Sequence, residues 1–197
     1  KNSFCNHALI SKFFGIMDSK GNNNYLIPVM EGSFVPIFYY PETKQFYLHT
    51  KHTSYVMELY EGHLVHSYWG SRVNKIPNLE WYYPFKFGAD FSATDIPGRL
   101  LNSTDKLHQE YPTYGTGDMR SPALQVENAT GDSITRLRYE SHRIFNGKPA
   151  LSGLPATYGE DCETLEITLA DAYTGLTVLL CYTVFPEKDV LARSSRI

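Results

Sequence analysis

The chain has 197 residues, which is enough for one domain with a substantial hydrophobic core that needs no disulfide or metal for stability. Its formal net charge is −3, from 18 basic and 21 acidic side chains that are scattered along the sequence. This balance argues against nucleic acid or an anionic membrane as a partner. The three cysteines have neither the spacing of a zinc site nor the number of a disulfide framework, so we expect a reducing compartment, the cytoplasm.

The start of the chain shows no clean helical or strand period, and the Gly-Asn cluster at residues 21–24 indicates a loop. The apolar runs near the start are interrupted by charged residues such as Lys12, and they are too short for a signal peptide or a membrane helix. We therefore expect residues 1–29 to be an irregular leader or an upstream segment, with Met30 as a candidate natural start. Residues 30–197 form the expected domain.

Most of the remaining chain consists of short runs rich in Tyr, Val, Ile, Leu and Thr, separated by Gly, Pro, Asn and Asp. This pattern is typical of antiparallel strands and turns. Apolar and aromatic positions within residues 47–59, followed by residues 64–69, predict a hairpin that turns at residues 61–62. Residues 133–139 and 141–145 predict two more strands.

The clearest strand pair lies near the end of the chain. Apolar residues alternate with polar ones in residues 165–169, residues 171–175 have turn composition, and residues 176–185 form the second strand. Residues 178–181 are apolar on both faces, which indicates a central strand that is covered on both sides. The predicted core residues here are Leu165, Ile167, Leu176, Val178 and Leu180.

No long amphipathic helix is visible at the period of 3.6 residues. The predicted fold class is therefore all-β, with a large antiparallel β-sandwich of the supersandwich type and few or no helices.

A self-contained active site is not apparent, because the sequence has no G-x-S-x-G elbow, Gly-rich phosphate loop or H-E-x-x-H motif. His63 and His66 are spaced as metal ligands can be, but residues three apart in a strand point to opposite faces, so we expect no metal. A retaining glycoside hydrolase needs two carboxyl groups about 5 to 5.5 Å apart. No pattern brings together any two of the candidate carboxylates, which are Asp90, Asp95, Glu110, Asp118, Glu160 and Asp161.

Residues 110–123 read EYPTYGTGDMRSPA, which resembles the EYPxYGxGDFRxPA stretch of bacterial family 36 glycoside hydrolases, the α-galactosidases. Other motifs of this family occur in the same order on both sides, among them HSYWG at residues 66–70 and GLPATY at residues 153–158. The resemblance extends from about Pro41 to Arg196. Several collinear motifs make it specific.

The resemblance implies the N-terminal β-sandwich domain of a retaining exo-α-galactosidase, which releases terminal galactose from melibiose, raffinose and related oligosaccharides without a cofactor. In this family both catalytic aspartates lie in a (β/α)8 barrel that follows the sandwich. We therefore expect no catalytic residue in this chain, and no activity of the chain alone. The resemblance also implies a homo-oligomer, often a tetramer, in which an N-terminal loop reaches the active site of a neighbouring subunit.

The corresponding loop here is roughly residues 81–97. Where relatives carry a motif like LDRxFS, this chain reads FGADFS at residues 87–92, so the acidic residue is displaced by two positions. Asp90 is the candidate substrate-binding residue that this alignment implies. Trp81 is a second candidate, either as a sugar platform or as a buried or interface anchor. Arg120, by contrast, is expected to fix loop backbone through its planar fork of donors.

Three classes of function stay open at this point. The first is an accessory domain of an α-galactosidase that serves oligomer assembly and shapes a neighbouring substrate pocket. The second is a self-sufficient carbohydrate-binding sandwich, which needs an exposed aromatic row or a polar groove that holds sugar. The third is a purely structural interaction domain. Trp69 is either a sugar platform or a packing anchor.

Overall fold

A computed structural model of the chain describes residues 13–17, 23–28, 35–79, 104–115, 117–153 and 156–197. The chain divides into two compact units, residues 1–35 and residues 36–197.

In the first unit, strands β1 (Phe13–Met17) and β2 (Asn23–Pro28) pair antiparallel. They fall within residues 1–29, where the sequence indicated no regular period. Strands of five and six residues contain too few alternations to stand out as a period. The domain boundary at residue 30 stays a prediction.

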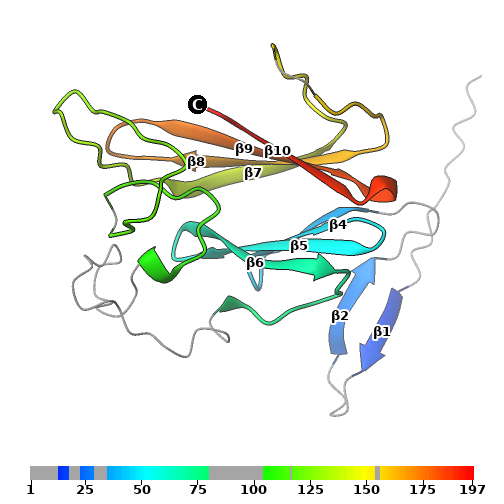
Figure 1. The fold of residues 1–197 in the computed structure, drawn as a ribbon. Helices are drawn as coiled ribbons and strands as arrows, with labels where there is room; N and C mark the ends of the chain where they lie inside the picture. The colour runs from blue at the N-terminus through cyan, green and yellow to red at the C-terminus, as the bar shows by residue number, and fades with distance from the viewer. Residues whose placement is uncertain (1–12, 18–22, 29–34, 80–103, 116, 154–155) are drawn as a thin grey trace, which may run out of the picture. The chain divides into compact units, whose positions relative to one another are not determined.

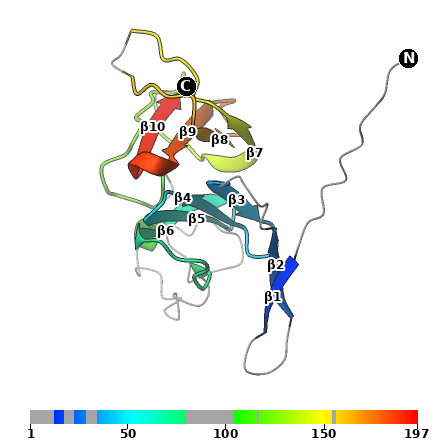
Figure 2. The ribbon, with the colours of Figure 1, turned by 90° about the vertical axis from the view of Figure 1, so that its right-hand side faces the viewer.

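The second unit contains two four-stranded antiparallel sheets, which form two layers (Figures 1 and 2). The first sheet, with strand order β3-β4-β5-β6, comprises β3 (Ile37–Tyr40), β4 (Gln45–His49), β5 (Thr53–Tyr60) and β6 (His63–Ser71). The second sheet, with strand order β10-β9-β8-β7, comprises β7 (Arg138–Asn146), β8 (Glu163–Ala170), β9 (Thr177–Phe185) and β10 (Val190–Arg196). The all-β sandwich predicted from the sequence is confirmed.

The described part of the chain contains two short 3-10 turns, η1 (Thr104–Lys106) and η2 (Pro186–Lys188). Within the same residues no helix is long and apolar enough to cross a membrane.

The predicted hairpin at residues 61–62 is confirmed as the connection of β5 and β6, with Tyr60 opposite His63. Its two turn residues both have positive φ, 49° at Glu61 and 82° at Gly62. Two consecutive left-handed residues are the requirement of the tight hairpin turn that matches the twist of antiparallel strands.

The strand predicted for residues 133–139 is wrong over most of its length, because β7 begins only at residue 138. The backbone before β7 makes other hydrogen bonds: Thr135 N donates to Tyr114 O at 2.9 Å, and Arg136 N donates to a carboxylate oxygen of Asp171 at 2.8 Å. A loop carbonyl and a side chain therefore take the place of a strand ladder. Periodicity alone could not reveal these partners.

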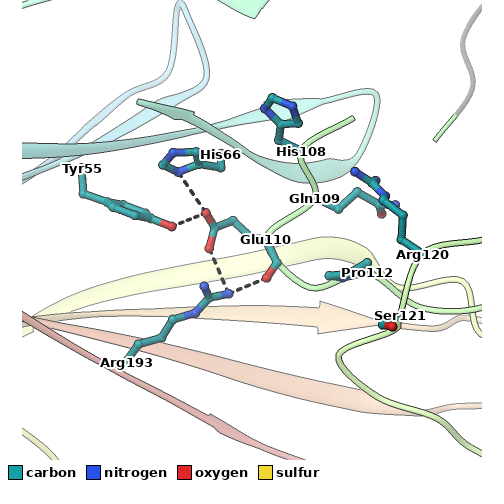
Figure 3. Close-up of a pocket in the computed structure, with 9 residues that line it drawn as sticks. All are labelled: Tyr55, His66, His108, Gln109, Glu110, Pro112, Arg120, Ser121 and Arg193. Carbon is teal, nitrogen blue, oxygen red and sulfur yellow. Dashed lines mark hydrogen bonds and ion pairs between the residues drawn. The ribbon is translucent and has the colours of Figure 1, made fainter. Parts of the chain in front are cut away.

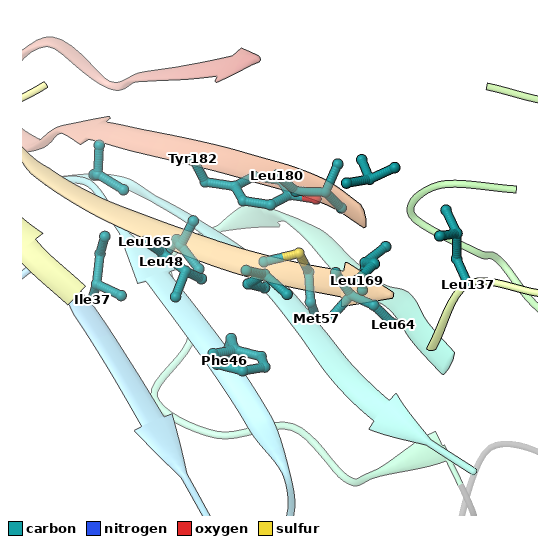
Figure 4. Packing of buried hydrophobic residues seen from close by; sticks show 13 residues of the cluster. Ile37, Phe46, Leu48, Met57, Leu64, Leu137, Leu165, Leu169, Leu180 and Tyr182 are labelled. Atoms are coloured by element: carbon teal, nitrogen blue, oxygen red, sulfur yellow. The ribbon is translucent and has the colours of Figure 1, made fainter. Parts of the chain in front are cut away.

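The hydrophobic core lies between the two sheets (Figure 4). Phe46, Leu48 and Met57 of the first sheet pack in one cluster with residues of β8 and β9 in the second sheet. Four of the five predicted core residues of this hairpin are buried: Leu165, Ile167, Val178 and Leu180. The fifth, Leu176, is only partly buried, since it lies in the turn before β9.

The outer face of β9 is also covered, as the apolar run at residues 178–181 predicted. Cys181 is 5% exposed on that face, with its Sγ 3.7 Å from Glu166 Oε2. The Glu166 carboxylate in turn accepts hydrogen bonds from Arg143 Nε at 2.7 Å and from Arg196 Nη2 at 2.9 Å. A polar network thus crosses the outer face of the second sheet from β7 to β10.

Candidate functional site

The loop that carries the EYPTYG motif is attached to the free edge of the first sheet. Glu110 N donates to Leu64 O at 3.0 Å, and His66 N donates to His108 O at 2.7 Å. These bonds place residues 108–110 alongside β6 as a short partner segment. They also direct the side chain of Glu110 into the space between the two sheets.

Glu110 is 6% exposed, and its carboxylate is bound from both sheets (Figure 3). Tyr182 on β9 donates to Oε2 at 2.8 Å, and Arg193 Nη2 on β10 lies 3.0 Å from the same oxygen and also donates to the Glu110 carbonyl. Tyr55 on β5 donates to Oε1, and His66 Nδ1 lies 3.5 Å from that oxygen. The carboxylate therefore links four strands in two layers.

The environment of Glu110 keeps its carboxyl group ionised. Burial raises its pKa, but the contact with His66, the charge of Arg193 and the two tyrosine hydrogen bonds outweigh burial, so the pKa is lower than usual. Burial and the Glu110 charge together raise the pKa of Tyr55 and of Tyr182. The tyrosines therefore stay neutral donors and the glutamate stays an acceptor. A general acid for glycoside hydrolysis needs the opposite shift, a raised carboxyl pKa.

Asp118 and Arg120 form a second cluster in the same loop. Arg120 holds both oxygens of the carboxylate, with Nε at 2.8 Å and Nη2 at 2.6 Å. The same Nη2 donates to Leu107 O at 2.6 Å and to Thr104 O at 3.2 Å. Burial raises the pKa of Asp118, but the hydrogen bonds and charge of Arg120 lower it overall. The prediction that Arg120 fixes loop backbone is confirmed.

A hollow of about 430 Å³ lies beside the Glu110 carboxylate (Figure 3). Its lining combines rings and hydrogen-bonding groups from both sheets and from the motif loop. The main contributors besides Glu110 are Tyr55, His66, His108, Gln109, Arg120 and Arg193. No group of three or more His, Cys, Asp or Glu side chains within the described residues could hold a metal ion.

The residues predicted to bind substrate, Trp81 and Asp90, lie outside the described residues, as does Asp95. Glu160 and Asp161 are exposed in the loop before β8. Of the six candidate carboxylates, the structure thus places only Glu110 and Asp118 in buried, hydrogen-bonded positions. Each has its own arginine partner.

The comparison that decides the family covers most of the second unit. The sequence model of the glycosyl hydrolase family 36 N-terminal domain matches residues 62–197. The chain belongs to this family.

Among curated relatives, α-galactosidase AgaA of Geobacillus stearothermophilus is 46% identical over 164 residues, which are 81% of this chain and 22% of AgaA. The bifunctional α-galactosidase/sucrose kinase AgaSK of Mediterraneibacter gnavus is 40% identical over 166 residues, which are 82% of this chain and 17% of AgaSK. This family 36 N-terminal domain therefore spans about a fifth of the length of the curated relatives that it matches.

Solved structures agree with the sequence comparison. The α-galactosidase AgaB of Geobacillus stearothermophilus matches 82% of this chain, and 22% of its own, at a TM-score of 0.75 and 44% identity. A variant of AgaA in complex with raffinose matches 77% of this chain, and 21% of its own, at a TM-score of 0.72 and 46% identity.

Sequence reasoning missed the partners of Glu110 in this family 36 domain. Tyr55, Tyr182 and Arg193 lie 55, 72 and 83 residues from Glu110, so no local spacing announces the cluster. The EYP motif identified Glu110 as a notable residue. Its role depends on which strands become neighbours in the sandwich.

Proposed function

We propose that this chain is the N-terminal, non-catalytic domain of a retaining exo-α-galactosidase that hydrolyses terminal α-galactosides such as melibiose and raffinose. The observation that carries the proposal is the family match over residues 62–197. It is supported by relatives of 31 to 46% identity that are α-galactosidases, one of them solved with raffinose bound.

The chemistry of the described carboxylates supports a non-catalytic role. Glu110 and Asp118 are the buried candidates, and both have lowered pKa values and all-protein hydrogen-bond partners. A retaining glycosidase needs one carboxyl group that is protonated at the start of the reaction and a second that is free to attack the sugar. Neither Glu110 nor Asp118 is suited to be the protonated acid or the free nucleophile. Their role is to hold the sandwich together.

A domain exchange tests the proposal directly. The segment of AgaA that matches this chain is replaced by this chain, and hydrolysis of raffinose is compared with that of intact AgaA and of AgaA lacking the segment. We expect the chimera to recover most of the activity that the deletion loses. A soluble chimera that is no more active than the deletion contradicts the proposal.

The domain also contributes to oligomer assembly and, through residues 81–97, to the substrate pocket of a neighbouring subunit. We infer this from the aromatic content of the loop and its alignment with the family's reaching loop. A residue that binds ground state and transition state alike changes KM and spares kcat. Asp90→Ala in the active chimera should therefore raise KM about ten-fold, equivalent to about 1.4 kcal/mol.

The matched control for this loop is Asp161→Ala, which removes an exposed carboxylate from a different loop. It should leave KM unchanged. Unaltered kinetics of the Asp90→Ala chimera on raffinose would remove Asp90 from the substrate site, and the same assay tests Trp81→Ala as the proposed aromatic contact. Light scattering of the chimera at several concentrations tests the assembly role.

We place the whole protein in the cytoplasm. Cys162 and Cys181 are both free thiols and both buried, which suits a reducing compartment.

A further inference from the structure

Three rings in mutual contact, and a fourth on the neighbouring segment, lie along the β6 edge of the sandwich. Trp69 meets Tyr55 edge to face, with ring centroids 5.0 Å apart, and Tyr55 meets His66 at 4.8 Å. His108 continues the row, since Val65 and Gln109 are antiparallel partners and the next pair on this register is His66 and His108. Directly opposite residues of an antiparallel pair place their side chains on the same face.

Trp69 begins the row and is 60% exposed. A tryptophan that is exposed to this degree presents a large apolar surface and an N–H donor to water, a combination that is enriched at binding interfaces. Its neighbour Tyr55 is held in place by its hydrogen bond to Glu110, so the row rests on a rigid support.

The hollow described above shares Tyr55, His66 and His108 with this row. Its volume of about 430 Å³ lies within the usual range of small-molecule pockets, about 300 to 1,000 Å³. The lining of the hollow therefore combines aromatic rings with hydrogen-bonding groups, and Trp69 adjoins it through its edge-to-face contact with Tyr55.

The charges around the hollow cancel. Arg193 is paired with Glu110, and Arg120 is paired with Asp118. An ionic ligand would have to compete with these pairs, whereas a neutral ligand with many hydroxyl groups can bond to the imidazoles, Gln109 and Ser121 without breaking them. The lining is thus suited to a neutral polar molecule with one apolar face.

A pyranose ring has this character, since one face carries C–H groups that pack on an aromatic ring and the rim carries hydroxyl groups. We propose that the hollow and Trp69 together form a binding subsite for a neutral pyranoside, separate from the loop at residues 81–97. The choice of an α-galactoside oligosaccharide as the ligand rests on the proposed function. An open site for one or two sugar units should bind with a Kd on the order of 1 mM, about 4 kcal/mol.

The test uses the full chain with Trp81→Phe as the background, because the sequence contains two tryptophans and this change leaves Trp69 as the sole reporter. Raffinose and melibiose are titrated while tryptophan fluorescence and heat are recorded. We expect a saturable change with both signals, and we expect His108→Ala to weaken binding at least ten-fold. Trp69→Ala, followed by heat alone, should do the same.

Tyr173→Ala is the matched control, since Tyr173 is 93% exposed in the β8–β9 turn and belongs to neither the row nor the hollow. It should leave the affinity unchanged. Circular dichroism of each variant establishes that the sandwich is folded before binding is compared.

Three results overturn the proposal. One is the absence of saturable binding up to about 100 mM sugar, roughly a hundred times the expected Kd. The second is binding that Trp69→Ala and His108→Ala do not change. The third is a change in molecular mass by light scattering in place of sugar affinity, which would make Trp69 a protein contact. These results come from the chain alone and do not depend on the activity of the chimera. Failure of the subsite is therefore distinct from failure of the proposed function.

Discussion

Glu110 receives hydrogen bonds from a tyrosine of each sheet and an ion pair from Arg193, all at one carboxylate. A buried acceptor of this kind stabilises the fold only while every partner is present, because each lost partner leaves a buried polar group unsatisfied. The EYP motif is therefore a structural device that fastens the loop between the two layers.

Glu110→Gln tests this role, since it preserves the shape and removes the charge. Arg193 then has no counter-charge, and one tyrosine hydroxyl meets an NH₂ group. We expect a loss of about 2 to 3 kcal/mol in the free energy of unfolding, measured by urea denaturation. Glu160→Gln, an exposed glutamate, should change it by less than about 0.5 kcal/mol. Equal effects of the two changes would contradict the structural role.

His49 belongs to a different part of the first sheet and sets a pH dependence. Its ring is buried, with Nδ1 2.8 Å from Ser54 Oγ, and burial together with the charge of Arg72 lowers its pKa to about 4. The unfolded pKa is about 6.5, so between pH 6.5 and pH 4 the unfolded chain binds a proton that the folded chain does not. The stability that depends on neutral His49 is therefore fully present above pH 6.5 and is lost progressively as the pH falls toward 4.

Each such histidine contributes at most about 1.4 kcal/mol per pH unit in this window. Burial also lowers the pKa of His63, to about 4, and the pKa of His142, so the wild-type slope reflects three histidines. His49→Asn should reduce that slope by up to about 1.4 kcal/mol per pH unit, measured from urea midpoints at pH 6.5, 5.5 and 4.5. An unchanged slope would show that His49 titrates normally in the folded protein. Glu110, whose pKa is lowered, adds its own loss of stability only in more acid solution, below about pH 4.3.

In the β8–β9 hairpin, the pattern of apolar residues correctly predicts which side chains are buried. Leu165, Ile167, Val178 and Leu180 were predicted as core residues and are buried, because alternation in β8 and a two-sided apolar run in β9 fix which faces are covered. The prediction of a strand at residues 133–139 was wrong because periodicity does not reveal hydrogen-bond partners outside a sheet. The backbone of this segment is satisfied by Tyr114 and by Asp171, which are distant in sequence.

Leu180→Ala measures the core of β9. The change removes buried methyl groups at a position that is 1% exposed and leaves a cavity between the sheets. We expect a cost of about 2 to 5 kcal/mol by urea denaturation. Thr177→Ala, at the exposed start of the same strand, serves as the control and should cost less than about 0.5 kcal/mol. A loss that small for Leu180→Ala would mean that its side chain does not lie in the core.

For the whole molecule, the sequence motifs predicted the family and the sandwich, while the candidate hollow could not be predicted. The hollow joins β5, β6, β10 and a loop, and its rings come from positions that are unremarkable on their own. The sequence cannot distinguish a sugar platform from a packing anchor at Trp69, because the exposure of the ring depends on how the two layers overlap. The Arg120 prediction succeeded because a fork of donors beside Asp118 is a local feature.

We propose that this domain supports an α-galactosidase and supplies neither catalytic carboxylate. Release of p-nitrophenol from p-nitrophenyl α-galactoside by the purified chain is the decisive assay. We expect no turnover above the buffer rate, since neither buried carboxylate of the described residues is free to act as acid or nucleophile. Turnover that increases in proportion to chain concentration, and persists through further purification, would contradict it.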